Sequence, residues 1–265
     1  MKIGFIGAGN MGSAIIKGIA NSSISSKAEL FAFDTFKDKL IALSEIGVTA
    51  MESAFDIAKN CKYVFLAIKP QQFGDVLPCI KDAVTEETVI VSIAAGITSE
   101  YIRSETIPNA KVVLVMPNTP LLLGIGATAL SKNDSVSNEE FLVVRQIFDS
   151  CGITAVIASD KMKEIIAING SSPAFIYLFA KGFVEYAESQ NIDGSTALSL
   201  FAQTLIGSAK MLTESGMTVD ELIRMVSSPG GTTLAGLDAL YEGKLTDIVA
   251  DACDRCTKRA YELSK

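Results

Sequence analysis

The chain opens with Lys2-Ile-Gly-Phe-Ile-Gly-Ala-Gly-Asn-Met-Gly-Ser-Ala-Ile-Ile-Lys-Gly-Ile-Ala20, a short apolar run followed by a glycine-rich turn and a helical pattern. A buried strand that turns directly into a helix is the first half of a βαβ unit. Gly7, Gly9 and Gly12 have the spacing with which such a turn holds a dinucleotide. The first glycine makes the tight turn, the second lets the backbone approach the pyrophosphate, and the third lets the helix pack on the strand. The alternative is a glycine-rich turn that binds no ligand.

The acid that ends the next predicted strand bears on which dinucleotide is preferred. Asp34 follows the glycines by roughly 20 residues, where a carboxylate can accept hydrogen bonds from the adenosine ribose. This position favours NADH, because a 2′-phosphate would face a negative charge. Thr35, Lys37 and Lys39 favour the opposite preference, since they can partner a phosphate. Asp34 can also be the N-cap of a helix over Thr35–Glu45.

The first 160 residues alternate short apolar runs with helical patterns such as Ser13–Ala20 and Lys37–Glu45. The apolar runs are nearly continuous rather than alternating, which is typical of parallel strands covered on both faces. We therefore predict an α/β Rossmann-type doubly wound sheet over residues 1–160. Its strands are expected at Lys2–Ile6, Leu30–Phe33, Tyr63–Ala67, Val89–Ile93, Lys111–Val115, Ile125–Leu130 and Gly152–Ile157.

The pattern becomes purely helical from residue 161 to 265. Long helices are expected over Lys161–Gln190 and Ser195–Glu214, and Thr218-Val-Asp-Glu221 has the spacing of a capping box that opens a third helix. These segments are apolar with few polar faces. We therefore expect part of this region to be an interface between subunits.

Composition excludes several classes of protein. Hydrophobic residues make up 49% of the chain, and 30 acidic against 23 basic residues give a net charge of -7, so we expect no nucleic-acid partner. The chain has no histidine, which rules out a Ser-His-Asp triad, a Cys-His pair and a histidine-bound metal. We predict no metal site. Any proton transfer then uses a hydroxyl, a carboxylate, a lysine or water.

The cysteines and the apolar stretches bear on location. The 5 cysteines are sparse and odd in number, which is typical of a reducing cytosol. Cys253 and Cys256 have the Cys-x-x-Cys spacing without a second pair, so we interpret them as helix residues. The uncharged stretch Val112–Leu130 is interrupted by prolines and glycines, so we predict two buried strands joined by a turn rather than a membrane-spanning segment. We predict a cytoplasmic protein with no membrane partner.

Three further motifs follow predicted strands, where open α/β sheets bind ligands. Ala67-Ile-Lys-Pro70 and Ser92-Ile-Ala-Ala-Gly96 each end a strand, and the small residues of the second leave room for a flat ring. Met116-Pro-Asn-Thr-Pro120 ends another, and its prolines hold the backbone of Asn118 so that the amide can be aimed. Taken singly, each motif is equally an ordinary strand-to-helix turn.

The helical half contains one chemically informative segment, Ser227-Ser-Pro-Gly-Gly-Thr-Thr233. Two glycines after a proline, followed by hydroxyls that open a helix, expose several backbone N–H groups. Such a nest suits a carboxylate. The alternative is a junction between helices that is capped by Thr232 or Thr233.

These motifs together make the chain resemble the pyrroline-5-carboxylate reductase family, the enzymes of the last step of proline synthesis. Five stretches occur in the order of the family and span nearly the whole chain. They are Ile6-Gly-Ala-Gly-Asn-Met-Gly12, Ala67-Ile-Lys-Pro70, Ser92-Ile-Ala-Ala-Gly96, Met116-Pro-Asn-Thr-Pro120 and Ser228-Pro-Gly-Gly-Thr-Thr233.

The resemblance implies a Rossmann domain over residues 1–160, and an all-helical dimerisation and substrate domain over residues 161–265. It implies homodimers that can assemble into rings, with each active site between the nucleotide domain of one subunit and helices of its partner. The implied reaction is reduction of L-1-pyrroline-5-carboxylate, a cyclic imino acid, to L-proline by NADPH or NADH. Of the two cofactors, Asp34 favours NADH.

The site residues carried over fall into two sets. The cofactor set is Gly7, Gly9, Asn10, Met11, Gly12, Asp34, Ala67, Ile68, Lys69, Pro70, Ala94, Ala95 and Gly96. The substrate set is Ser228, Gly230, Gly231, Thr232 and Thr233, joined by Asn118. Within it, Thr233 is the expected catalytic residue, because its hydroxyl would face the ring nitrogen.

Two alternatives stay open at this point. A β-hydroxyacid dehydrogenase shares the architecture and uses a lysine just after the nucleotide domain, where Lys161 and Lys163 lie. A catalytically idle, nucleotide-binding regulatory paralogue is the other. It is kept open by Ser172 and Phe175, where the family usually has glycine and tyrosine.

Overall fold

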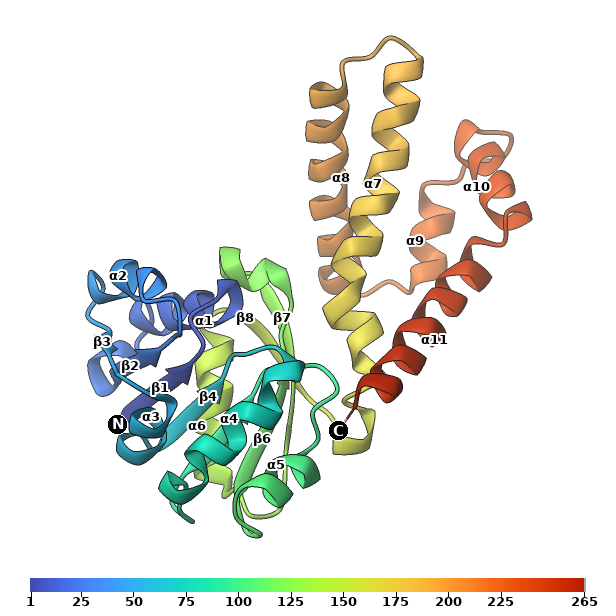
Figure 1. Cartoon of the computed structure of the whole chain (residues 1–265). Coiled ribbons are helices and arrows are strands. Elements are labelled where there is room, and N and C mark those ends of the chain that lie inside the picture. Colours follow the sequence, from blue (N-terminus) through green and yellow to red (C-terminus); the bar gives the residue numbers. More distant parts are fainter. Residues whose placement is uncertain (265) are drawn as a thin grey trace. The chain divides into compact units, whose positions relative to one another are not determined.

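The computed structural model describes residues 1–264 and divides the chain into two compact units (Figure 1). The first unit is Met1–Ser171 together with Arg255–Lys265, and the second is Ser172–Asp254. The boundary that we predicted after residue 160 stays a prediction about where the functional domains divide.

The first unit is built on an 8-stranded sheet with the order β3-β2-β1-β4-β5-β6-β7-β8. Each strand predicted from the sequence is present. The strands are β1 (Lys2–Ile6), β2 (Glu29–Phe33), β3 (Thr49–Ala50), β4 (Tyr63–Leu66), β5 (Val89–Ser92), β6 (Lys111–Met116), β7 (Gly126–Lys132) and β8 (Gly152–Val156). The short, exposed β3 was not predicted, since it has only 2 residues and no apolar pattern.

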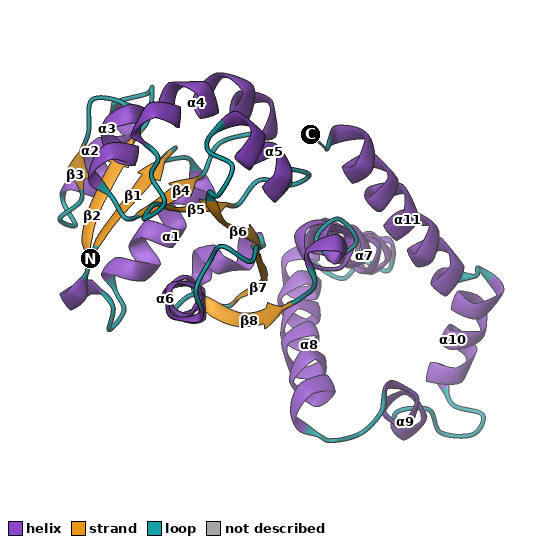
Figure 2. Cartoon of the chain, turned by 90° about the horizontal axis from the view of Figure 1, so that it is seen from below, coloured by secondary structure: helices purple, strands orange, loops and turns teal. Residues whose placement is uncertain are grey.

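The continuous apolar strands follow from burial on both faces. Phe5 points into one core cluster and Ile6 into the other. Helices α1 (Asn10–Ala20), α2 (Asp38–Ser44) and α6 (Asn138–Asp149) supply side chains to the first cluster. Helices α3 (Ala54–Asn60), α4 (Phe73–Ile80) and α5 (Ser99–Glu105) supply side chains to the second. Figure 2 shows α1 and α6 on one side of the sheet and α3, α4 and α5 on the other.

The sheet departs from an all-parallel arrangement at one place. β7 pairs antiparallel with β6, whereas every other neighbouring pair is parallel. The link from Met116 to Gly126 holds only a 3₁₀ turn over Thr119–Leu123, shorter than the dozen or so residues that a parallel crossover needs. Gly124, at φ 74°, reverses the chain. The two expected strands around a turn are therefore confirmed, and they run in opposite directions.

The second unit consists of helices. They are α7 (Ser172–Ser189), α8 (Gly194–Glu214), α9 (Val219–Met225), α10 (Thr232–Glu242) and the beginning of α11 (Leu245–Leu263). The capping box that we predicted for α9 is confirmed, since Thr218 and Glu221 each accept a backbone hydrogen bond from the other. The single helix expected over Lys161–Gln190 is wrong at its start. A π-helical turn over Ile166–Ser171 precedes α7, because Pro173 has no N–H to donate to the carbonyl four residues earlier.

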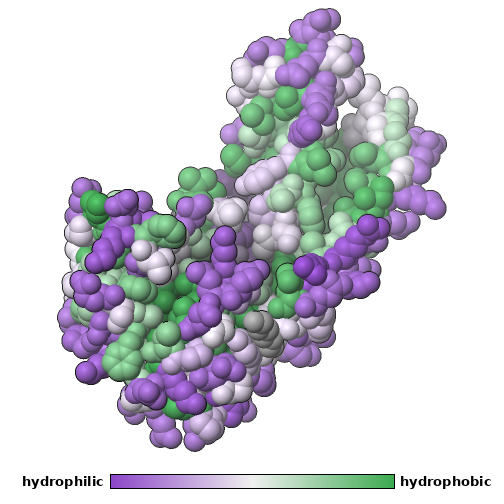
Figure 3. Space-filling model, in the orientation of Figure 1, coloured by the Kyte–Doolittle hydropathy of each residue, from purple (hydrophilic) through white to green (hydrophobic). Residues whose placement is uncertain are grey.

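The helices of the second unit bury few of their apolar side chains. In α7 only Pro173 and Ala187 are buried, and α8, α9 and α10 have no buried residue in this chain. Figure 3 shows apolar residues spread over the visible face of these helices. Apolar residues exposed there include Ile176, Leu178, Leu198, Ile206, Leu212 and Val249. A surface of this kind marks a site of association. Among residues 1–264, no helix has the length and apolar character needed to cross a membrane.

Candidate functional site

The glycine-rich turn after β1 is held by close backbone packing. The N–H of Gly7 donates to the carbonyl of Phe33 at 2.8 Å, and Gly7 has φ 103°, a conformation that favours glycine. A Cβ on Gly7 would overlap the carbonyl oxygen of Ala67, and a Cβ on Gly12 would overlap that of Gly7. These two glycines are therefore required by the fold itself.

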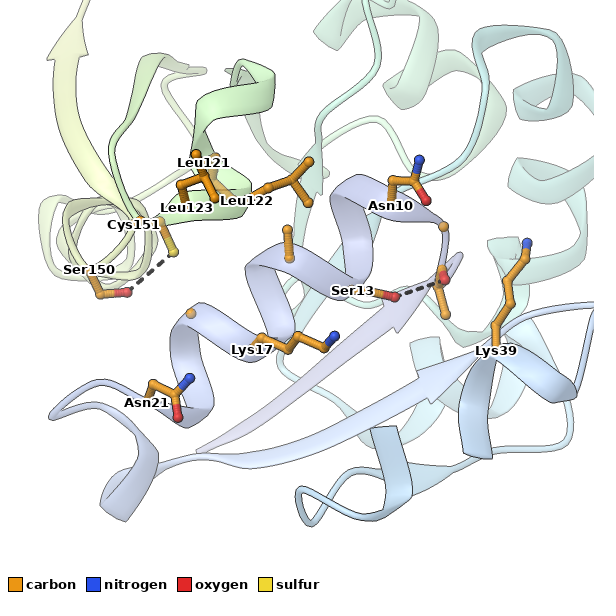
Figure 4. A pocket seen from close by; sticks show the side chains of 15 residues that line it. Asn10, Ser13, Lys17, Asn21, Lys39, Leu121, Leu122, Leu123, Ser150 and Cys151 are labelled. Carbon is orange, nitrogen blue, oxygen red and sulfur yellow. Dashed lines mark hydrogen bonds between the residues drawn. The ribbon is translucent and has the colours of Figure 1, made fainter. Parts of the chain in front are cut away.

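Gly9 has a different environment. It is the N-cap of α1, with φ -70° and ψ -173°, values open to any residue, and a Cβ built on it would meet no atom within 4 Å. The backbone next to it is fixed, since the hydroxyl of Ser13 donates to the carbonyl of Ala8 at 2.9 Å (Figure 4). Free space in front of the first N–H groups of α1 is what a pyrophosphate requires. The turn therefore fits a dinucleotide.

A cavity of about 780 Å³ opens beside this turn. Ala8, Gly9 and Asn10 are among its lining residues, and Lys17 and Lys39 contribute positive charges (Figure 4). Met11 and Gly12 continue the first turn of α1.

Asp34 lies at the end of β2, only 8% exposed, with both carboxylate oxygens engaged. Oδ2 accepts from the N–H of Ala8 at 2.8 Å, and Oδ1 accepts from the N–H of Phe36 at 2.9 Å. Lys39 Nζ lies 3.2 Å from each oxygen. Burial alone raises the pKa of Asp34, but these two N–H groups and the ammonium outweigh it, so the pKa lies below its usual value. Asp34 is thus ionised, and it ties the glycine turn to the end of β2.

The N-cap role that we considered for Asp34 is wrong. Helix α2 begins at Asp38, later than the expected Thr35, and its N-cap is Lys37. The carboxylate is already directed towards Ala8 and Phe36, so it makes a turn before the helix rather than a cap.

The remaining cofactor motifs end strands that neighbour β1. Because β1, β4, β5 and β6 are adjacent, the turns after them share one edge of the sheet. The residues Ala67, Ile68, Lys69 and Pro70 follow β4, and Ala94, Ala95 and Gly96 follow β5. A second cavity, of about 430 Å³, lies at Ala94 and Gly96 and is also lined by Met116 and Tyr261. The structure therefore brings the expected cofactor residues to one edge of one sheet.

Asn118 lies beyond β6 with part of its amide already used. Its Oδ1 accepts from the N–H of Ala127 at 2.9 Å, which ties the end of β6 to the beginning of β7. The amide nitrogen is the group left to address a ligand. The expected substrate role of Asn118 stays a prediction.

The other substrate residues lie in the second unit, at the start of α10. Gly230 has φ 70°, and the N–H of Gly231 donates to the carbonyl of Ser228 at 2.9 Å. Gly231 is the N-cap of α10 and no side chain caps the helix, so Thr232 and Thr233 are its first residues. The alternative in which a threonine caps the helix is therefore wrong.

Two polar residues were left out of the expected site. Lys39, which the sequence offers as a partner for a phosphate, is in the structure the ion-pair partner of Asp34. Asn169 is buried and its Nδ2 donates to the carbonyl of Met116 at 2.6 Å, which fixes the π-helical turn to the end of β6. A lone amide in an apolar stretch was the signal that could have found Asn169.

Comparisons with known proteins cover the whole chain. The family model described as pyrroline-5-carboxylate reductase dimerisation matches residues 159–263, and the one described as NADP oxidoreductase coenzyme F420-dependent matches residues 2–96. The pyrroline-5-carboxylate reductase of Escherichia coli is 34% identical over 100% of this chain and 98% of its own. That of Methanosarcina acetivorans is 32% identical, also over 100% and 98%.

Solved structures agree with these sequence relatives. The crystal structure of Plasmodium falciparum pyrroline carboxylate reductase with NADP bound matches with a TM-score of 0.90 at 30% identity, over 100% of this chain and 98% of the other. The 1-pyrroline-5-carboxylate reductase of Streptococcus pyogenes matches with a TM-score of 0.90 at 33% identity, over 99% and 98%. The resemblance predicted from five short motifs is confirmed, and the chain belongs to the pyrroline-5-carboxylate reductase family.

Proposed function

We propose that this protein reduces L-1-pyrroline-5-carboxylate to L-proline with NADPH or NADH, the last step of proline synthesis. The observation that carries the proposal is the open, pre-formed turn at Gly9 in a chain that matches reductases of this name along its whole length. The bound dinucleotide supplies the hydride. The chain's own contribution is to hold two flat rings together and exclude water.

The segment Ser228–Thr233 is the proposed site for the substrate carboxylate. Gly230 in the left-handed region and the extended Gly231 leave the first N–H groups of α10 without helical partners. Oriented backbone N–H groups of this kind bind anions. The chain has a net charge of -7, so an anionic substrate needs such a local positive site.

Thr233 is the proposed catalytic residue. Its hydroxyl takes no part in capping α10, so it is available to hydrogen-bond the ring nitrogen or to relay a proton from water. In a chain without histidine, a hydroxyl beside the nitrogen is the simplest route for that proton.

The assembly that we propose is a homodimer formed through the helical unit, able to build larger rings. The dimerisation model matched to residues 159–263 and the exposed apolar helices support it. The proposed active site lies between the nucleotide domain of one subunit and helices of its partner. A cytoplasmic location also remains a proposal.

The alternative of a β-hydroxyacid dehydrogenase depends on two candidate lysines, and of these Lys163 lines the second cavity together with Ala94 and Gly96, whereas Lys161 does not. Lys161 is exposed and pairs with Asp160 at 3.6 Å, and Lys163 lies 4.5 Å from the centre of the Tyr261 ring. The test follows the loss of reduced nicotinamide with pyrroline-5-carboxylate as substrate. A 3-hydroxyacid with the oxidised cofactor and a mixture without substrate are the controls. Turnover only with the 3-hydroxyacid, or with neither, would refute the proposal.

A further inference from the structure

The carboxylate of Asp34 has no acceptor position left for a ribose hydroxyl. An ionised carboxylate offers about four lone-pair positions. The N–H of Phe36 and Lys39 occupy Oδ1, and the N–H of Ala8 and Lys39 occupy Oδ2. A ribose hydroxyl can therefore reach Asp34 only if the ammonium of Lys39 moves away.

The two partners of this ion pair differ in exposure, since Lys39 lies on the solvent side and Asp34 is buried. The Lys39 side chain is 43% exposed and lines the cavity that begins at the glycine turn. Asp34 is held from inside by two backbone N–H groups, which fix its position and favour the ionised form. The Lys39 ammonium also lies 4.8 Å from the centre of the exposed Phe36 ring, which gives it a cation–π contact in addition to the ion pair.

The neighbouring Lys37 is a different kind of cation. It pairs with Glu52 at 3.5 Å, and both side chains are more than four-fifths exposed, at 82% and 86%. Exposed pairs of this kind contribute little and are screened by salt. Lys37 therefore carries the same charge on the same segment without touching Asp34.

We propose that Lys39, rather than Asp34, sets how this protein discriminates between NADPH and NADH. Lys39 neutralises the buried carboxylate and is the cation available to a 2′-phosphate, so the protein binds NADPH at least as tightly as NADH. This inference rests on the proposed dinucleotide function. The preference for NADH that we predicted from Asp34 loses its premise, because that carboxylate is ion-paired and its acceptor positions are filled.

The decisive variant is Lys39→Met, which keeps most of the apolar stem and removes the charge. The 2′-phosphate then meets an uncompensated carboxylate. We expect the Kd of NADPH to rise by about tenfold or more, roughly 1.4 kcal/mol, and the Kd of NADH to change by less than about threefold. Lys37→Met is the matched control and should leave the ratio of the two constants within about twofold.

Two further variants keep the proposal testable if Lys39→Met is unstable. Lys39→Arg should retain NADPH binding, since the charge survives. The double variant with Asp34→Asn and Lys39→Met should recover part of the lost NADPH affinity, because it removes the repelling carboxylate together with the lysine. A melting temperature for each variant shows whether the fold is kept.

The measurement is calorimetric binding to the full-length purified protein, without turnover. The probes are NADPH, NADH, adenosine 2′,5′-bisphosphate and adenosine 5′-monophosphate. In the unaltered protein, added salt should weaken binding of the bisphosphate more steeply than that of the monophosphate. If Lys39→Met changes both dinucleotides equally or neither, or if Lys37→Met has the same effect, Lys39 is not the determinant. If the unaltered protein binds no dinucleotide at all, the proposed function itself is wrong.

Discussion

Replacing Gly9 by valine separates binding from folding. A Cβ at this position meets no atom within 4 Å, and the backbone at φ -70° and ψ -173° accepts any residue. Two small effects on stability oppose each other. A glycine N-cap is replaced by a poor one, which costs about 1 kcal/mol, and the unfolded chain loses freedom, which contributes about 0.4–1 kcal/mol in the other direction. The expected net change in the free energy of unfolding is therefore within about 1 kcal/mol, or roughly 2–4 °C in Tm.

The effect of Gly9→Val on the cofactor should be much larger. The isopropyl group enters the space into which we place the pyrophosphate, in front of the first N–H groups of α1. We expect the Kd of either reduced dinucleotide to rise by at least about a hundredfold, or roughly 2.7 kcal/mol. Calorimetric titration and thermal denaturation of the same sample measure both quantities.

Gly7→Ala is the matched contrast, because its Cβ would overlap the carbonyl oxygen of Ala67 at a φ of 103°. We expect this variant to lose about 2–4 kcal/mol of stability. Unchanged affinity in a folded Gly9→Val protein would show that the pyrophosphate does not approach Gly9. A collapse of its melting temperature, equal to that of Gly7→Ala, would show that Gly9 is needed for the fold instead.

Three further predictions concern catalysis, acid stability and assembly. Thr233→Ala should lower kcat/KM by roughly ten- to hundredfold with little change in Tm, since Gly231 is the helix cap, and Thr233→Ser should retain more activity. A fall in stability with turnover preserved would contradict this role. Burial raises the pKa of Glu140, but Lys111 at 2.9 Å, the N–H of Ser137 and Lys62 outweigh it and hold the pKa below its usual value. The stability that Glu140 contributes is thus present above its unfolded pKa of about 4.3 and lost as pH falls through the lower folded value. Glu140→Gln should cost about 2 kcal/mol at neutral pH and flatten the acid limb of the stability curve, as denaturation at several pH values would show. Finally, analytical ultracentrifugation at low micromolar concentration should find at least a dimer, and an active monomer would refute the proposed assembly.

Much of the first unit could be predicted from local patterns. Its strands are continuously apolar because alternate side chains enter two separate cores, and this leaves a clear pattern in the sequence. The spacing of Gly7, Gly9 and Gly12 is a local signal, although Phe33 and Ala67 hold the turn in place. In the second unit, the capping box of Thr218 and Glu221 is a short-range arrangement in the same way. The motifs after β4 and β5 could be assigned to one edge of the sheet, because parallel strands have their carboxyl ends at the same edge.

Other features could be known only from the tertiary structure, because they depend on contacts between residues that are distant in the sequence. The two-residue β3 exists only because β2 lies beside it. The meaning of Asp34 changed most. From the sequence alone Asp34 is a free acid. In the fold, the N–H of Ala8 in the glycine turn and the ammonium of Lys39 in α2 both contact its carboxylate, so its charge is already balanced. Residue types and spacing determine which groups arrive at an edge of the sheet, whereas packing determines which of them still have hydrogen bonds and charge to offer a ligand.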